Sequence, residues 1–371
     1  MNTVTDYLYA KAAKNHIPLG GTFELSPVCN FSCKMCYVRK TNAQIRSEGK
    51  RLRTAEEWLA LAKKCADEGM LYLLLTGGEP FLYAGFKELY IQLHKMGLVL
   101  SINSNGTMID EHTVAWLKEY APSRINITLY GANEDTYGRI CGNREGYHRA
   151  VKAIQMLIDA KIPVVINSSM IPENAEDLEE IVKFGYSLGI NTRVATYMVP
   201  PVRRDAEETD SRFTPEESAR LQIRHVRCAV SREAYVDWLE RKSKIGADET
   251  AGDWGDSLEP DFMKCRAGRS AFWISWDGTM TACGIMGFPR AEYPFEEDFA
   301  ACWKRLNEAV LSTQVLCSCA GCPKKELCRP CAAMVASECG DVNGKPEYLC
   351  ALAQSLQTEI RTELEEIKNE N

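Results

Sequence analysis

Three cysteines lie within one eight-residue stretch near the N-terminus, and no fourth cysteine stands beside them. Cys29, Cys33 and Cys36 belong to the segment "CNFSCKMC", with three residues between the first two and two between the last two. Structural metal sites are usually closed by four protein ligands, whereas reactive sites keep one position open. Three thiolates at this spacing therefore predict a metal centre with a vacant position, such as an iron–sulfur cluster in which one iron can bind a further molecule.

The composition favours thiolate metal binding in a protein without membrane or nucleic-acid contacts. The chain has 371 residues, 16 cysteines and five histidines, and no histidine lies near a cysteine cluster. Mixed cysteine–histidine zinc fingers are therefore disfavoured, which leaves iron–sulfur clusters or four-cysteine zinc. The net charge of −7 argues against a nucleic-acid partner. The sequence has neither a membrane-spanning apolar stretch nor a signal peptide, so we expect a cytoplasmic protein without disulfides.

The first two hundred residues alternate between strand and helix patterns. Residues 54–69 have the pattern of a capped helix, and residues 71–76 are an apolar run typical of a strand buried on both faces. Strands are predicted at 21–26, 71–76, 98–103, 124–130, 163–169 and 191–197. Helices are predicted at 54–69, 84–96, 110–120, 146–160 and 175–188. Six such units predict an α/β fold with a parallel sheet, either a partial barrel or an open sheet.

The polar and glycine-rich segments of this region all follow predicted strands. They are the cysteine loop and the segments "TGGEP", "NSNGT", "YGAN" and "NSS". Ligands of parallel α/β folds bind at the carboxyl ends of the strands. We therefore expect these five segments to line one rim of the sheet.

The residues of this rim resemble those of radical S-adenosylmethionine (SAM) enzymes. "CNFSCKMC" matches the CxxxCxxC signature of that family, and "GGEP" at 77–80 matches its glycine–glycine–glutamate motif after the second strand. One departure is Met35, where the family often has an aromatic residue, and Tyr37 is then expected to contact adenine. The resemblance implies a partial (β/α)6 TIM-like barrel with a four-iron four-sulfur cluster on the three cysteines. SAM would bind the open iron, and its reductive cleavage would give a 5′-deoxyadenosyl radical that abstracts hydrogen.

The resemblance also implies contacts between SAM and other rim residues. Gly77 and Gly78 would let the backbone approach the cofactor closely. The Gly78–Glu79 segment would accept a hydrogen bond from the SAM ammonium group. Arg139 would pair with the SAM carboxylate, although its spacing from Thr128 is about one residue shorter than in similar enzymes. The other expected SAM contacts are Ser104, Asn105, Thr128, Asn167 and Ser168.

A second group of cysteines lies in the C-terminal third of the chain. Cys265 and Cys283 flank a predicted hairpin with its turn at residues 276–278. The segment "CSCAGCPKKELCRPC" adds Cys317, Cys319, Cys322, Cys328 and Cys331. Its two CxxC pairs look like zinc knuckles, but they are five residues apart, whereas zinc ribbons usually separate them by about 15–20 residues.

This second group resembles the SPASM extension of radical SAM enzymes, which holds auxiliary clusters. Four residues separate Gly278 from Cys283, as in that motif, and the last interval of its CxxCx5Cx3C run is two residues here instead of three. The resemblance implies one auxiliary four-iron four-sulfur cluster on Cys319, Cys322, Cys328 and Cys350, with Cys350 preferred to Cys339 because similar enzymes have a longer gap there. A second would be held by Cys265, Cys283 and Cys331, with either Cys317 or an open position as the fourth ligand.

We therefore expect three parts: a radical SAM barrel at 1–213, a helical bridge and linker at 214–262, and a SPASM domain at 263–371. The bridge begins with a helix at 214–242, and an amphipathic helix at 351–369 closes the chain. Cys65 is expected in the core. Cys141 is expected to be structural, with a substrate-facing thiol as the alternative, while Tyr197 and Arg203 are candidate substrate contacts.

The resemblance implies an enzyme that oxidises a peptide or protein, forming a thioether or carbon–carbon crosslink, or formylglycine. Expected partners are this substrate and an electron donor such as flavodoxin or ferredoxin. About 20 residues precede the first strand, so we expect no N-terminal leader-binding domain. Either a separate protein recruits the peptide or the substrate is not a leader peptide. The alternatives are dehydrogenation of a small molecule such as a sugar alcohol, and a non-catalytic electron carrier or zinc scaffold.

Overall fold

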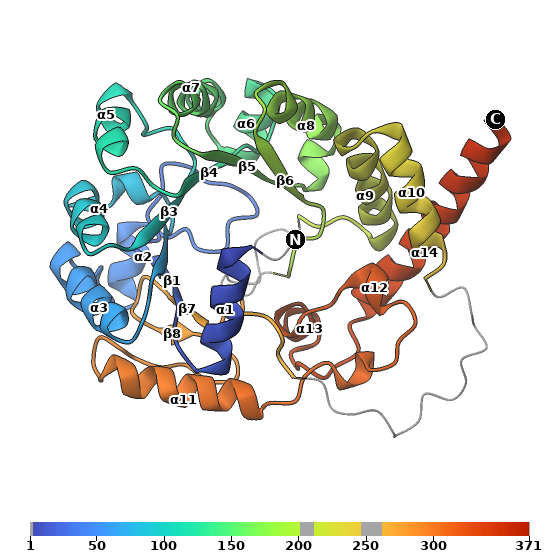
Figure 1. The fold of residues 1–371 in the computed structure, drawn as a ribbon. Coiled ribbons are helices and arrows are strands. Elements are labelled where there is room, and N and C mark those ends of the chain that lie inside the picture. Colours follow the sequence, from blue (N-terminus) through green and yellow to red (C-terminus); the bar gives the residue numbers. More distant parts are fainter. Residues whose placement is uncertain (1–2, 201–210, 246–261, 371) are drawn as a thin grey trace. The chain divides into compact units, whose positions relative to one another are not determined.

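The computed structural model describes residues 3–200, 211–245 and 262–370. Its sheet has the strand order β6-β5-β4-β3-β2-β1-β7-β8 (Figure 1). The strands are β1 (Gly20–Glu24), β2 (Tyr72–Thr76), β3 (Val99–Ser104), β4 (Arg124–Thr128), β5 (Val164–Ser169), β6 (Asn191–Ala195), β7 (Ala271–Ile274) and β8 (Met280–Thr281). All six strands expected from the sequence are present, and β1 to β5 pair in parallel. The predicted α/β class is thus confirmed.

Helices are present in each of the five ranges expected between the strands, and further helices occur that the sequence did not predict. The helices are α1 (Val4–Lys14), α2 (Asn42–Ser47), α3 (Ala55–Asp67), α4 (Phe86–Lys95), α5 (Glu111–Glu119), α6 (Glu134–Cys141), α7 (Gly146–Asp159), α8 (Leu178–Ser187), α9 (Pro215–Ala229), α10 (Arg232–Ser243), α11 (Phe299–Ser312), α12 (Lys325–Cys328), α13 (Ala332–Cys339) and α14 (Glu347–Glu370). Short 3-10 helices occur at Pro80–Leu82, Pro172–Asp177 and Cys317–Cys319. The single helix expected over 214–242 is wrong, because Ser231 starts a new helix by accepting the Ala234 N–H at 3.3 Å.

The predicted hairpin is confirmed and has an additional role in the sheet. Strands β7 and β8 pair antiparallel, and β7 also pairs in parallel with β1. Gly278 has a φ of +93° in the connecting turn, a backbone conformation that glycine adopts without strain. The sequence predicted the hairpin from its local turn, but not that it would extend the sheet beyond β1.

The chain forms two compact units. The first comprises Met1–Leu129, Asn133–Asn167 and Lys264–Thr313, and the second comprises Tyr130–Ala132, Ser168–Met263 and Gln314–Asn371. These units cut across the three parts expected at 1–213, 214–262 and 263–371, and that division stays a prediction. Arg203 and most of the expected linker lie outside the described residues.

In the first unit, helices α3, α4, α5 and α7 lie outside the curved row of strands (Figure 1). Phe23 of β1 packs against Trp58 of α3, with ring centroids 4.8 Å apart. Because strand side chains alternate between faces, Thr22 and Glu24 point to the opposite, inner face. The inner face of the strands is therefore distinct from the apolar layer under the helices.

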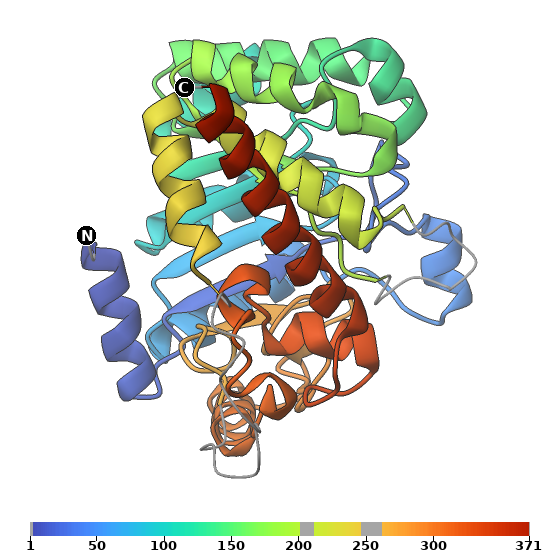
Figure 2. The same ribbon diagram turned by 90° about the vertical axis from the view of Figure 1, so that its right-hand side faces the viewer.

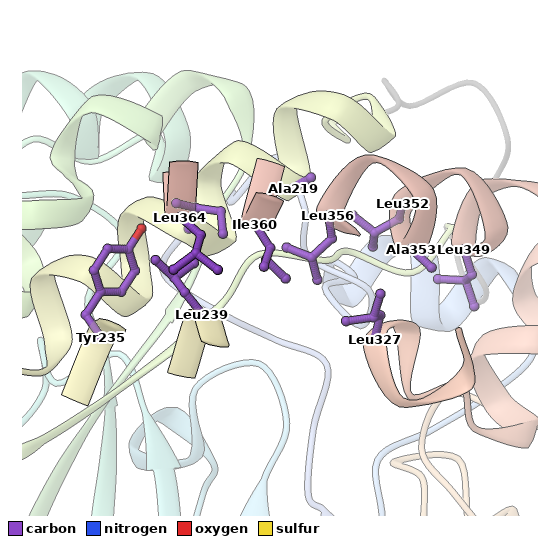
Figure 3. Packing of buried hydrophobic residues seen from close by; sticks show 11 residues of the cluster. Ala219, Tyr235, Leu239, Leu327, Leu349, Leu352, Ala353, Leu356, Ile360 and Leu364 are labelled. Atoms are coloured by element: carbon purple, nitrogen blue, oxygen red, sulfur yellow. The ribbon is translucent and has the colours of Figure 1, made fainter. Parts of the chain in front are cut away.

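The core of the second unit is built around the long helix α14, which lies along α9 and α10 (Figure 2). Leu352, Leu356 and Ile360 of α14 are buried against side chains such as Leu239 and Tyr235 of α10 (Figure 3). Leu327 of α12 joins the same cluster, so the cysteine-bearing segment is packed on this helical core. No helix among the described residues is long and apolar enough to cross a membrane.

Candidate cofactor site

The strand register of the first unit brings the predicted rim segments to one edge of the sheet. Glu24 pairs with Thr76, and Ser104 pairs with Ile127 one residue before the end of β4. Thr128 at the end of β4 pairs with Asn167. The cysteine loop, "GGEP" and "NSNG" therefore begin at neighbouring strand ends, as parallel pairing requires.

The cysteine loop is held by the C-terminal end of α6. The Ser32 N–H donates to the Cys141 carbonyl at 2.9 Å, and the Lys34 N–H donates to the Ile140 carbonyl at 3.0 Å. Helix ends leave carbonyl groups without intrahelical partners, and the loop supplies donors for two of them. These two bonds flank Cys33 and fix its position beside the helix.

The three thiols of the loop influence one another electrostatically. Burial raises the pKa of the Cys29 thiol to about 12, and the negative charges of Glu79, Cys33 and Cys36 add to this shift. Among the described residues, three potential ligand atoms lie within 4.8 Å of one another only at Glu292, Glu297 and Cys302. The three loop thiols are therefore not gathered within 4.8 Å of one another, the compact arrangement that ligands of a single ion would have.

Buried Glu79 connects the second and third rim segments. One carboxylate oxygen accepts the Ser104 hydroxyl at 2.9 Å and the Phe81 N–H at 3.1 Å, and the other accepts the Asn105 N–H at 2.8 Å. Burial raises the pKa of Glu79 to about 7, against the opposing effect of these hydrogen bonds. Both carboxylate oxygens are thus used to organise the rim itself.

Gly77 and Gly78 let the cysteine loop approach "GGEP" closely. A Cβ atom on Gly77 would lie 2.3 Å from the Ser26 carbonyl oxygen, and one on Gly78 would lie 2.3 Å from that of Val28. The Gly78 N–H also donates to the Ser26 carbonyl at 2.7 Å. The sequence predicted a close approach to the cofactor, whereas the close neighbours in the structure are the backbone atoms of the loop. Contact with SAM stays a prediction.

Asn105 joins the third rim segment to the cysteine loop. Its side-chain amide donates to Asn30 Oδ1 at 2.8 Å and lies 3.7 Å from Cys29 Sγ. Asn30 in turn donates to the Thr107 hydroxyl at 2.8 Å. Asn30 and Thr107 were not expected from the sequence, although Asn30 stands inside the CxxxC interval and Thr107 directly follows "NSNG".

The other expected SAM contacts have other neighbours in the structure, and their roles stay predictions. Tyr37 packs against the buried cluster of Val38, Ile45 and Trp276. Arg139 donates to the Thr136 hydroxyl at 3.1 Å. The Thr128 carbonyl accepts a hydrogen bond from the Tyr137 hydroxyl, and Asn167 lies beside Thr128 in the strand register. In the second unit, the Ser168 hydroxyl lies 3.5 Å from the Met170 sulfur.

A layer of polar side chains crosses the inner face below the rim. Glu24, Thr76, Asn103 and Asn126 are neighbours in the register of β1 to β4. Asn126 donates to Asn103 Oδ1 at 2.7 Å, while its own buried Oδ1 has no hydrogen-bond partner among the described residues. This layer was not expected from the sequence, although each of its residues lies next to a buried leucine, isoleucine or phenylalanine along its strand.

The structure brings four of the predicted auxiliary ligands together. Burial raises the pKa of the Cys328 thiol to about 12, and the negative charges of Cys319, Cys322 and Cys350 raise it further. Cys339 also lies near Cys319 and Cys350. Burial raises the pKa of the Cys339 thiol, and the negative charges of these two cysteines add to the shift. Cys350 and Cys339 thus both lie near this group, and the choice of Cys350 as the fourth ligand stays a prediction.

The ligands expected for the second auxiliary cluster are divided between the two units. Cys265 and Cys283 belong to the first unit, while Cys331 and Cys317 belong to the second. This cluster and its fourth ligand therefore stay a prediction. No disulfide joins any of the 16 cysteines, all of which lie in the described part of the chain.

The compact Glu292, Glu297 and Cys302 group belongs to an ion-pair network. Arg305 pairs with Glu297 at 2.8 Å and also contacts Glu292, which pairs with Arg290 as well. Cations of the protein already neutralise these carboxylates, so the group does not need a metal ion.

Comparisons with known proteins agree with the geometry. Residues 23–185 match the Radical SAM superfamily. The sporulation killing factor maturation protein SkfB of Bacillus subtilis (strain 168) is 27% identical over 283 residues, which are 74% of this chain and 62% of SkfB. AdoMet-dependent heme synthase of Methanosarcina barkeri (strain Fusaro / DSM 804) is 22% identical over 341 residues, 88% of this chain and 94% of the synthase.

A solved structure supports the fold over nearly the whole chain. The structure of anSMEcpe with bound AdoMet and Cp18Cys peptide has a TM-score of 0.66 at 17% identity, and covers 95% of this chain and 99% of that chain. The prediction of a partial barrel followed by a cysteine-rich region is confirmed. The chain spans less than two thirds of SkfB.

Proposed function

We propose that this chain is a radical SAM enzyme related to SPASM-type peptide-modifying enzymes, and that it oxidises a peptide or protein by hydrogen abstraction. The product would be a thioether or carbon–carbon crosslink, or formylglycine. The observation that carries this proposal is the three-thiol loop held against the Glu79 rim at the carboxyl ends of the strands. A non-catalytic electron carrier or zinc scaffold would need neither an open ligand position nor such a rim.

Cys29, Cys33 and Cys36 would hold the four-iron four-sulfur cluster, whose donor set suits iron and leaves one iron for SAM. The cluster and SAM, when bound, supply the electron and the radical precursor for hydrogen abstraction. The chain's own residues position this chemistry. Hydrogen bonds from Ser32 and Lys34 fix the loop on α6, and Asn105 and Asn30 hold its other side.

The polar inner layer supports a substrate that enters the barrel with polar groups. Asn126 offers a buried carbonyl oxygen without a partner among the described residues, and such a group is costly to leave unsatisfied. A peptide N–H or a hydroxyl group supplies the matching donor. The peptide bound in the anSMEcpe structure supports the peptide class for this chain.

Auxiliary clusters complete the proposal. Cys319, Cys322, Cys328 and Cys350 would hold one, as the mutual influence of their thiols supports. Cys265, Cys283 and Cys331 would hold another, with Cys317 or an open position as the fourth ligand. They would accept the electron that remains after hydrogen abstraction, or bind a substrate thiolate. We place the enzyme in the cytoplasm, with flavodoxin or ferredoxin as its donor and a separate protein as a candidate recruiter of the peptide.

A small molecule is the second candidate substrate. The chain covers 94% of the AdoMet-dependent heme synthase, a larger share than of SkfB, and that relative is named for heme synthesis and not for peptide modification. Dehydrogenation of a small molecule such as a sugar alcohol would use the same radical site.

Anaerobic reconstitution with iron and sulfide tests the proposal. We expect about twelve irons per chain if three four-iron clusters form, and SAM-dependent release of 5′-deoxyadenosine on reduction. Zinc in place of iron and no 5′-deoxyadenosine would contradict the radical SAM assignment. Candidate peptides from neighbouring genes, compared with sugar alcohols by product mass, decide the substrate class.

A further inference from the structure

We propose that Cys33 and Cys141 form a reversible disulfide when the cysteine loop carries no cluster. The inference deepens the proposed function, because it rests on Cys33 being a cluster ligand. It assigns Cys141 a role as the redox partner of that ligand. A substrate-facing thiol and a purely structural residue were the roles expected from the sequence.

The backbone places these two cysteines side by side. Residues on both sides of Cys33 donate to the last carbonyls of α6, Ser32 to Cys141 and Lys34 to Ile140. Gly142 ends the helix in the left-handed region with a φ of +68°, and a Cβ there would lie 2.3 Å from Ser32 Oγ. The loop therefore cannot shift far along the helix end, and Cys33 stays opposite Cys141.

The thiol groups themselves are in contact. The Cys33 and Cys141 side chains are hydrogen-bonded to each other. Cys141 is 0% exposed. The other loop sulfurs face backbone donors, since Cys29 accepts the Phe31 N–H at 3.4 Å and Cys36 accepts the Arg39 N–H at 3.3 Å.

Hydrogen peroxide is a suitable oxidant. The Cys33 thiol gives up its proton and attacks one peroxide oxygen, the O–O bond breaks, the leaving hydroxide takes up the proton and departs as water, and Cys33 becomes a sulfenic acid. The Cys141 thiol then forms the S–S bond and water leaves, so peroxide has taken two electrons in total. A dithiol reductant restores both thiols by exchange. While the disulfide persists, Cys33 cannot bind iron, but it is protected from irreversible oxidation to sulfinic acid.

Disulfide mapping of the full chain tests this assignment. Cluster-free protein, prepared with a chelator, is treated with hydrogen peroxide, blocked with N-ethylmaleimide and digested with trypsin without reductant. Cleavage after Arg139 and Arg144 isolates Cys141 in residues 140–144, while cleavage after Lys14 and Lys34 leaves Cys33 with Cys29 in residues 15–34. Fragmentation of the linked pair distinguishes Cys33 from Cys29.

We expect a linked 15–34/140–144 pair through Cys33, lost after dithiothreitol and absent from anaerobic, cluster-loaded enzyme. In Cys141→Ser and Cys141→Ala, peroxide should instead increase sulfinic acid at Cys33 several-fold. Cys65→Ser is the matched control, because Cys65 is also 0% exposed but lies in α3, and it should behave as wild type.

Linkage of Cys33 mainly to Cys29 or Cys36, or full alkylation of Cys141 after unfolding of the peroxide-treated protein, would overturn the inference. The wild-type map decides this even if the Cys141 variants do not fold. Iron content and 5′-deoxyadenosine release of untreated, reconstituted enzyme report separately on the proposed function. A disulfide in a chain that fails that assay would refute the function but not the contact.

Discussion

At the scale of residues, the candidate site is organised by one buried carboxylate. The Glu79 side chain is 1% exposed and accepts hydrogen bonds from Ser104, Asn105 and Phe81. A single side chain therefore connects the segments that follow β2 and β3. A buried acceptor with all its donors in place rigidifies a site, whereas removal of the acceptor leaves those donors unsatisfied. The first consequence is a dependence of stability on pH.

Glu79 should make the cluster-free chain less stable as pH rises from about 4.5 to 7. Burial raises the folded-state pKa from 4.5 to about 7, so the folded chain keeps a proton that the unfolded chain loses over this interval. The free energy of unfolding therefore falls with pH, by about 3 kcal/mol at most, and levels off above pH 7. Urea unfolding of wild type and Glu79→Gln across this range measures the difference.

The control for that series is Glu88→Gln, because Glu88 is exposed on α4. It should retain the wild-type slope, whereas Glu79→Gln should be flatter between pH 4.5 and 7. Identical slopes in wild type and Glu79→Gln would show that Glu79 does not titrate as its burial requires.

At the scale of elements, the site depends on loops that dock against one another. The cysteine loop contacts "GGEP" through Gly77 and Gly78 and contacts the end of α6 through Ser32 and Lys34. Neither contact involves the regular hydrogen bonds of a helix or sheet. The glycine pair therefore has a packing role in addition to the cofactor contact expected from the family resemblance.

Gly78→Ala should disturb this docking. The new Cβ would lie 2.3 Å from the Val28 carbonyl oxygen, and backbone atoms cannot move aside as a flexible side chain can. We expect a loss of stability of about 1–3 kcal/mol and a decrease in iron bound at the loop, measured by urea unfolding and metal analysis. Gly287→Ala is the matched control, because no atom lies within 4 Å of its added Cβ. Equal behaviour of the two variants would contradict the packing role.

At the scale of the whole molecule, each unit contains its own group of thiols that we propose to bind a cluster. The first unit contains the loop with Cys29, Cys33 and Cys36, and the second contains Cys319, Cys322, Cys328 and Cys350. Cys328 of the second group packs against the helical core of α9, α10 and α14. Loss of one site should therefore leave the other site able to load.

Single substitutions test this independence. Cys33→Ala should abolish 5′-deoxyadenosine formation and remove about four irons, because a three-cysteine site cannot hold its cluster with two. Cys328→Ala should remove a similar amount of iron from the second unit but retain SAM cleavage in the absence of substrate. Iron analysis and product chromatography compare the two variants. Survival of SAM cleavage in Cys33→Ala after clean cluster loss would refute the loop assignment.

Much of the fold and part of the site were predictable because their signals are local. The alternation of strands and helices follows from short apolar patterns, and the three-cysteine loop from its spacing. The break at Ser231 between α9 and α10 was missed, since a continuous helical pattern hid a local cap. Asn30 and the Asn103–Asn126 pair were missed because their partners lie on different strands or loops.

The sequence by itself determined the α/β class, the three-cysteine loop after the first strand and the second group of cysteines. Only the tertiary structure decided that β7 extends the sheet beside β1, that Glu79 binds the "NSNG" segment, and that Cys33 meets Cys141. The physical reason is distance along the chain. Periodicity and motif spacing act over a few residues, whereas these contacts join segments that only strand pairing and helix packing bring together.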